Sequence, residues 1–200
     1  YKDKKSCNLS TIGSTSFFPS KPLGCYGDGG ALFTNDDELA EKFRWVRIHG
    51  QERKHHHPIL GINGRMDTLQ AAILLEILEV FPDEVQKREN LGQTYSEGLA
   101  HLEGLETPSI GEHNTSVYAQ YTILAEQREE IQQSLKEKDI PSVSYYSVPL
   151  HLQPVFQNLG HQAGDFPVAE KVANQGLSLP MSPYLPQDDQ SKVIDTISKL

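Results

Sequence analysis

The sequence predicts an α/β fold, because short apolar segments of strand length alternate with longer segments of helical periodicity. Two further observations support this class. Clusters of glycine, proline and asparagine separate the segments, as expected for turns. A chain of 200 residues, 37% of them hydrophobic, can also bury a sizeable core in one or two domains.

The first predicted elements enclose a glycine-rich loop. One strand is predicted at residues 12–18, and a second strand is predicted at residues 31–34. The glycines between them permit positive φ angles and close approach of the backbone to a ligand. Residues 35–37 offer N-cap side chains for a helix that ends near Gly50, and residues 51–65 are expected to form a loop.

A long helical segment opens at residues 67–68. Its apolar side chains wrap most of the surface, which predicts a helix buried on several sides or placed in a subunit interface. These residues are Leu69, Ala72, Ile73, Leu75, Ile77 and Leu78. Pro82 is expected to end or kink this helix, and a polar helix is expected to run from Asp83 to about Leu102.

Shorter elements follow Gly104 and predict a small α/β or α+β domain. Two segments read as strands and three as helices, without an internal repeat. The strands are predicted at 117–124 and 142–148, and the helices at 127–138, from 166 onward, and at 186–200.

Composition excludes several classes of protein. A net charge of −9 argues against a general nucleic-acid binder, which normally carries a basic face. No apolar run approaches the length of a membrane span, and no signal peptide is visible, so no membrane partner is expected. Two cysteines, Cys7 and Cys25, are too few for a disulfide framework and fit a reducing cytoplasm.

Lys21 is the clearest candidate for a chemically reactive residue, because it lies between a predicted strand end and the glycine-rich loop. A lysine that is desolvated there would have a lowered pKa and could act as a nucleophilic amine toward a carbonyl. The alternative is an ordinary solvated loop lysine.

A series of motifs in this chain resembles the DegT/StrS family of nucleotide-sugar aminotransferases. The segments lie at residues 16–21, 27–31, 34–36, 49–51, 61–67, 69–74, 149–154 and 177–181. They occur in the family's order over nearly the full length, without large gaps. Within the family, residues 19–26 and 117–122 are most similar to the branch that aminates UDP-linked 3-oxo-glucuronic acid sugars for bacterial O-antigens.

The resemblance implies a fold-type-I transferase that depends on pyridoxal 5'-phosphate (PLP). Residues 1–80 would be the C-terminal part of the large α/β domain that binds PLP, and residues 81–200 a linking helix with a small α/β C-terminal domain. The chain is therefore expected to be the C-terminal half of a longer enzyme. The absent half would supply the acid at the pyridine nitrogen and the residue that stacks on the ring.

The resemblance also assigns roles around the cofactor. Lys21 would bind PLP covalently and then move the proton between substrate and cofactor carbons. A related dehydratase branch has histidine at this position, so lysine favours transamination. The Ser16 hydroxyl would donate a hydrogen bond to the cofactor phosphate. The alternative is a serine at the end of a strand whose hydroxyl forms a hydrogen bond with its own backbone.

Two further roles fall in the loop at 61–65. By resemblance, Asn63 reaches across a dimer interface to the phosphate of the partner's cofactor. Arg65 can bind an acidic group bidentately, and a sugar carboxylate would suit it. The alternative is a solvated arginine. The family usually has serine where this chain has Gly64.

Histidine and tyrosine side chains complete the candidates. Residues 55–57 are three adjacent histidines, but no nearby cysteine or acid pattern completes a zinc set, so no metal is expected. By resemblance, this stretch lies near the nucleotide or the interface, which makes His56 a candidate substrate ligand. Tyr146 is a second candidate, although Tyr145 replaces the histidine that usually precedes it.

The expected function is transfer of an amino group from L-glutamate to C3 of a UDP-linked 3-oxo-glucuronic acid sugar, in a homodimer with shared active sites. Two alternatives remain open. The substrate could be another nucleotide-linked keto-sugar, or the chain could be a non-catalytic fragment that dimerises and binds ligand.

Overall fold

The computed structural model describes all residues from 1 to 200 and divides into two compact units. Unit 1 contains residues 1–83 and 111–115, and unit 2 contains residues 84–110 and 116–200. The expected domain division after residue 80 stays a prediction about the complete enzyme. The structure has no helix with both the length and the apolar character needed to cross a bilayer.

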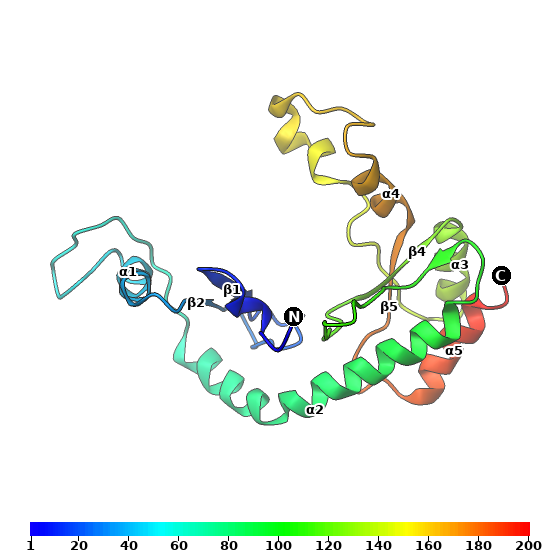
Figure 1. Cartoon of the computed structure of the whole chain (residues 1–200), viewed down its shortest axis with the longest axis horizontal. Coiled ribbons are helices and arrows are strands. Elements are labelled where there is room, and N and C mark those ends of the chain that lie inside the picture. The colour runs from blue at the N-terminus through cyan, green and yellow to red at the C-terminus, as the bar shows by residue number, and fades with distance from the viewer. The chain divides into compact units, whose positions relative to one another are not determined.

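Unit 1 is organised around a two-stranded antiparallel sheet. Strand β1 (Gly13–Ser16) pairs with β2 (Gly30–Phe33), and Ser16 lies opposite Gly30. A short 3-10 helix, η1 (Ser6–Asn8), precedes the sheet, and helix α1 (Asp37–Arg47) follows it (Figure 1). Both predicted strands and the predicted helix are therefore confirmed. The long loop between the strands carries Lys21.

The ends of α1 form as the local sequence predicts. The Asp36 carboxylate accepts hydrogen bonds from the backbone N–H groups of Glu38 and Leu39, which caps the first turn. At the other end Gly50 adopts a positive φ of 70°. A Cβ on Gly50 would lie 1.8 Å from the Ile59 carbonyl oxygen, so only glycine allows the chain to pass there.

Helix α2 (Thr68–Leu99) is one continuous helix that contains Pro82. Of the two outcomes predicted at Pro82, an end of the helix, with a second helix starting at Asp83, was wrong, and a kink stays a prediction. Proline removes only one N–H from the ladder of hydrogen bonds, and the helical spacing of apolar residues continues on both sides of it.

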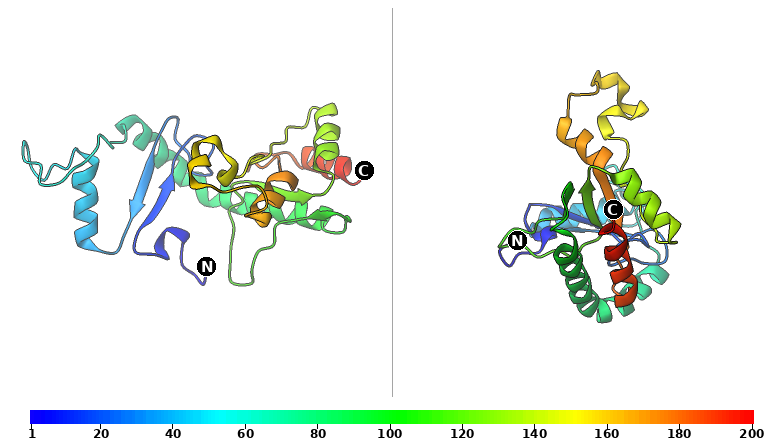
Figure 2. Two further views of the ribbon diagram at one scale, coloured as in Figure 1. Left: turned by 90° about the horizontal axis from the view of Figure 1, so that it is seen from above. Right: turned by 90° about the vertical axis from the view of Figure 1, so that its right-hand side faces the viewer.

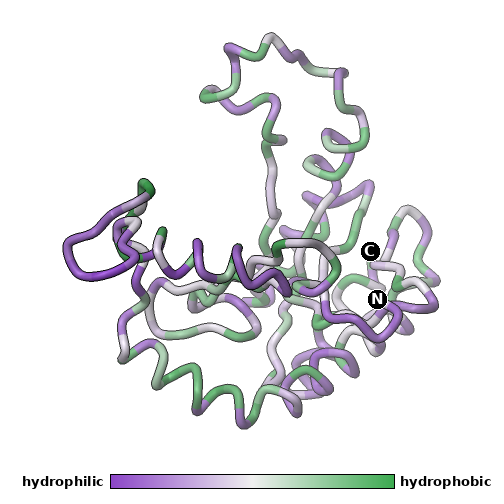
Figure 3. The backbone as a smooth tube through the Cα atoms, turned by 60° about the vertical axis from the view of Figure 1, so that its left-hand side comes forward, coloured by the Kyte–Doolittle hydropathy of each residue, from purple (hydrophilic) through white to green (hydrophobic).

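The first half of α2 is rich in hydrophobic residues (Figure 3), yet much of this surface is open to solvent. Leu74 is buried, whereas Leu69 is 77% and Leu75 64% exposed. The expectation that this segment is buried on several sides is therefore wrong for the chain as it stands. A place in a subunit interface remains a prediction.

Unit 2 contains a three-stranded antiparallel sheet in the order β3-β4-β5. The strands are β3 (Leu105–Glu106), β4 (Tyr121–Ala125) and β5 (Gly176–Leu179). The helices of this unit are α3 (Arg128–Glu137), α4 (Pro167–Gln175) and α5 (Gln187–Ile197), together with the second half of α2 (Figure 2). Alternate side chains of β4 are buried, which is typical of a strand with one face in a core.

The core of unit 2 joins residues from α2, the sheet, α3 and α5. Its buried members are Tyr95, Leu99, Tyr121, Ile123, Ala125, Ile131, Leu135, Ile140, Leu177, Leu179, Val193 and Ile197. Two tyrosines inside it keep their hydroxyls satisfied: Tyr95 donates to the Pro180 carbonyl, and the Tyr121 hydroxyl lies 2.7 Å from Ser96 Oγ. Burial raises the pKa of both phenols, so both are neutral.

The three predicted helices of unit 2 are confirmed, but the strands differ. The predicted strand at 142–148 is absent, and only Val143 makes an isolated bridge, to Ser178. The sheet instead uses β5, which sequence patterns missed because Gly176–Leu179 is short and has no β-branched residue. The segment between Ser144 and Phe166 holds two 3-10 helices, η2 (Leu150–Leu152) and η3 (Pro154–Leu159).

Candidate functional site

The loop between β1 and β2 is closed on itself by backbone hydrogen bonds. The Phe17 N–H donates to the Gly29 carbonyl, and the Cys25 N–H donates to the Phe17 carbonyl, both at 2.8 Å. The buried Cys25 thiol also lies 3.0 Å from the same Phe17 oxygen. Lys21 sits within this closed loop, where its N–H donates to the Phe18 carbonyl. The loop therefore presents Lys21 from a defined backbone.

The Lys21 side chain is exposed, and its amine has no hydrogen-bond or ion-pair partner in the chain. The desolvated setting expected for this lysine is therefore not present in the 200-residue structure. Pro19 and Pro22 lie within two residues of Lys21 on either side. Its position leaves the amine open to an incoming carbonyl.

Ser16 ends β1, five residues before Lys21. Its Oγ accepts a hydrogen bond from the Phe18 N–H at 3.2 Å. A hydroxyl that accepts in this way still has its own proton to donate. The backbone contact and a donor role toward a phosphate are therefore compatible, and Ser16 and Lys21 share one loop.

Asn63 and Arg65 lie in the segment that returns alongside the end of α1. Asn63 forms a β-bridge with Ile48, and its side chain is exposed without a partner in the chain. Arg65 Nη1 donates to His49 Nε2 at 3.2 Å. Since one guanidinium has five N–H donors, Arg65 keeps most of its capacity for an acidic ligand.

His56 lies at the exposed turn of residues 51–60, where its Nδ1 is 2.8 Å from Glu52 Oε2. A different histidine of this run contacts the chain just after α1: His57 Nδ1 donates to the His49 carbonyl at 3.0 Å. The structure has no group of three His, Cys, Asp or Glu side chains placed to hold a metal ion.

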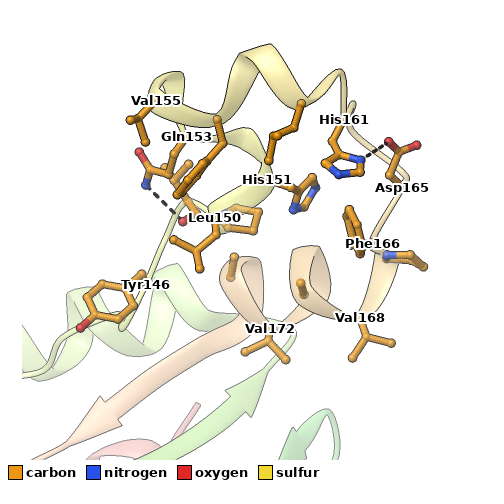
Figure 4. Close-up of a pocket in the computed structure, with 17 residues that line it drawn as sticks. Tyr146, Leu150, His151, Gln153, Val155, His161, Asp165, Phe166, Val168 and Val172 are labelled. Atoms are coloured by element: carbon orange, nitrogen blue, oxygen red, sulfur yellow. Dashed lines mark hydrogen bonds and ion pairs between the residues drawn. The ribbon is translucent and has the colours of Figure 1, made fainter. Parts of the chain in front are cut away.

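Tyr146 belongs to unit 2, where it stands at the rim of a groove of about 1210 Å³ (Figure 4). Its side chain is 75% exposed. The rest of the lining is mainly apolar and comes from η2, η3 and α4, including Leu150, Val155, Phe156 and Val172. No sequence pattern predicted this groove. Residues 148–159, where apolar residues alternate irregularly with polar ones, are the part of the sequence that supplies much of its lining.

His151 lies at one side of the groove, against Phe166, with the two ring centroids 4.8 Å apart (Figure 4). Its Nε2 is 3.1 Å from Glu170 Oε1. The Glu170 carboxylate also accepts from the N–H groups of Gly164 and Phe166. These bonds, the Gly164 N–H first, lower the pKa of Glu170.

Gln70 is a residue of the site whose role the sequence analysis missed, although it lies within one of the recognised motifs. Its Oε1 accepts a hydrogen bond from the Tyr26 N–H at 2.9 Å, across 44 positions of the sequence. No local pattern signals this contact, because it exists only when the Lys21 loop and α2 are folded together.

The chain is similar to known proteins over nearly its full length. The family model described as "DegT/DnrJ/EryC1/StrS aminotransferase family" matches residues 1–198. The chain is 52% identical over 185 residues to "UDP-2-acetamido-2-deoxy-3-oxo-D-glucuronate aminotransferase" from Pseudomonas aeruginosa, which is 92% of this chain and 50% of that protein. It is 44% identical over 201 residues to "Pleiotropic regulatory protein" from Geobacillus stearothermophilus, which is 100% of this chain and 54% of that protein.

A solved structure shows the same fold. The "X-ray crystal structure of S. venezuelae DesV in complex with ketimine intermediate" superposes with a TM-score of 0.96 at 36% identity, and covers 100% of this chain and 54% of that one. The chain thus spans about half the length of the relatives it matches. By its family match and its fold, the chain belongs to the DegT/DnrJ/EryC1/StrS aminotransferase family.

Proposed function

We propose that this chain carries the lysine half of the active site of a PLP-dependent aminotransferase. The observation that supports this most directly is the loop of Lys21, which holds an exposed and unpaired amine on a closed backbone. Family membership and the DesV neighbour, which was solved with a ketimine intermediate, support the same assignment.

The residues present fit PLP. An unpaired primary amine is the group that this aldehyde requires, and the free proton of the Ser16 hydroxyl suits a phosphate oxygen. When bound, PLP supplies an electron sink that makes the proton on the substrate carbon labile. Lys21 Nζ would take that proton from the substrate carbon and return it to the aldehyde carbon of the cofactor. Asn63, whose amide is exposed and unpaired, would bind the cofactor phosphate of a second subunit.

The overall reaction would exchange an amino group for a keto oxygen. L-glutamate becomes 2-oxoglutarate, and the C3 ketone of a UDP-linked 3-oxo-glucuronic acid sugar becomes an amine. Arg65 suits the carboxylate of the sugar acid, because a guanidinium binds it through two parallel N–H donors. The Pseudomonas aeruginosa relative, 52% identical, supports this substrate. We place the reaction in the cytoplasm, in O-antigen synthesis, with His56 and Tyr146 as further substrate contacts.

A second candidate is the same reaction on another nucleotide-linked keto-sugar. The observation that favours it is Tyr145, which stands where the branch usually has histidine, next to the proposed sugar contact Tyr146. The Geobacillus relative, which is named as a regulatory protein, favours a third candidate function, the binding of a ligand without turnover.

The test is the visible absorption spectrum after PLP is added to this chain and to the full-length protein that its gene encodes. Lys21→Ala is compared with Lys42→Ala, which changes a solvent-exposed lysine of α1. A band that only Lys21→Ala removes supports the covalent role, and turnover of UDP- against dTDP-linked keto-sugars with L-glutamate then identifies the substrate. A band that survives Lys21→Ala, or no band in either protein, would overturn the proposal.

A further inference from the structure

One hydrogen bond ties the Lys21 loop to helix α2. The Tyr26 N–H donates to Gln70 Oε1 at 2.9 Å, and Gln70 lies in the first turn of the helix. The Tyr26 ring is 80% exposed, so its side chain does not anchor the loop. Every other hydrogen bond made by residues 17–29 stays within the loop or reaches its own strand end.

Side chains at the start of α2 and just before it also determine how closely the Lys21 loop can approach the helix. A Cβ on Gly27 would lie 3.0 Å from Gln70 Nε2, and a Cβ on Gly29 would lie 2.9 Å from Met66 Sδ. Gly27 therefore leaves room for the Gln70 side chain of α2, and Gly29 for the Met66 side chain just before this helix. The side-chain amide of Gln70 lies beside Gly27. Its Oε1 accepts the Tyr26 N–H, and its Nε2 is the atom that a Cβ on Gly27 would approach.

This contact connects the two parts of the candidate site in unit 1. Lys21 lies on one side of Tyr26 in the sequence, within a loop whose backbone closes at Phe17 and Cys25. Asn63 and Arg65 lie in the segment that leads directly into α2. A shift of the loop against Gln70 would therefore change the position of the Lys21 amine relative to the helix that this segment enters.

We propose that Gln70 is a positioning residue for Lys21: its side-chain oxygen holds the Tyr26 N–H and thereby sets the Lys21 loop against the start of α2. Gln70 does not touch Lys21, and it acts through the loop backbone. The inference rests on the proposed function, since it concerns how well Lys21 is placed for PLP.

The experiment compares three variants of the full-length protein. Gln70→Leu removes the acceptor at similar volume, Gln70→Glu keeps an acceptor oxygen, and Gln93→Leu is the control. Gln93 lies on the same helix, is exposed, and bonds only to Glu97. The readouts are the Kd for PLP from the absorption band, kcat and KM for the sugar, the hydrogen exchange rate of the Tyr26 amide, and Tm.

Gln70→Leu is expected to speed exchange at Tyr26, to raise the Kd for PLP about 10-fold and to lower kcat about 10-fold, with KM for the sugar unchanged. Gln70→Glu is expected to stay within about 3-fold of wild type, and Gln93→Leu to change nothing. Tm of each variant is expected within about 3 °C of wild type.

Two results would overturn the inference alone: unchanged exchange at Tyr26 in Gln70→Leu, or faster exchange with the Kd and kcat of wild type. A wild-type protein without a Lys21-dependent band would instead overturn the proposed function, and the inference with it.

Discussion

His151 Nε2 lies 3.1 Å from Glu170 Oε1, and this pair joins the irregular segment that lines the groove to helix α4. The same carboxylate accepts from the N–H groups of Gly164 and Phe166. The Glu170 side chain of α4 therefore bonds to three residues of a segment that has few regular hydrogen bonds of its own.

Glu170→Ala is expected to loosen this segment, because two backbone donors lose their acceptor. The amide hydrogens of Gly164 and Phe166 should exchange faster, while those of β4 and β5 keep their rates. Glu129→Ala is the control, because the Glu129 side chain is 89% exposed and lies on α3. Equal exchange in Glu170→Ala and wild type would contradict the role.

Acid should have a similar local effect. The N–H of Gly164, followed by that of Phe166, lowers the pKa of Glu170, so the folded state favours the carboxylate. Its contribution is present above the unfolded pKa of about 4.3 and is lost as the pH falls through the lower folded pKa. An NMR titration of the Gly164 and Phe166 amides checks this: both should shift as the pH falls below about 4.3, and Glu170→Gln should abolish that shift.

Ser16→Ala is expected to weaken PLP binding by about 10-fold, because a hydrogen bond to a charged phosphate contributes about 1.5 kcal/mol. Ser16→Thr keeps the hydroxyl and should bind within about 3-fold of wild type. Ser14→Ala, two residues earlier on the same strand, is the control. The titration uses the absorption band of the full-length protein, and equal affinities for Ser16→Ala and Ser14→Ala would rule out the phosphate contact.

Arg65→Ala is expected to raise KM for a UDP-linked 3-oxo sugar acid by about 10- to 100-fold, because the bidentate contact to the carboxylate is lost. Arg65→Lys should recover only part of this, since lysine binds as a point charge. The comparison substrate is the matching sugar without its carboxylate. Its KM should be the same in all three proteins, and a parallel rise would show that Arg65 does not recognise the acid.

Leu99→Ala should lower the free energy of unfolding of unit 2 by about 2–5 kcal/mol, because it leaves a cavity in a well-packed core. Leu99 is fully buried. Val168→Ala in the same unit is the control: Val168 of α4 is 75% exposed, so its change should be within about 0.5 kcal/mol. Chemical denaturation measures both, and equal effects would contradict the assigned core.

Local chemistry in the sequence determined much of unit 1. Asp36 caps α1 and Gly50 ends its turn through interactions within a few residues, and such signals can be read without the fold. The family, and with it the role proposed for Lys21, also followed from ordered motifs.

Tertiary structure alone decided the remaining features, because each depends on residues that are distant in the sequence. Helix α2 continues through Pro82 although the proline predicts a break there. Strand β5 exists because β4 offers it a partner, with Tyr121 opposite Leu179, and its own residues have little preference for a strand. The bond from Tyr26 to Gln70 spans 44 positions. No local pattern contains such contacts, since burial and pairing arise only when the chain has folded.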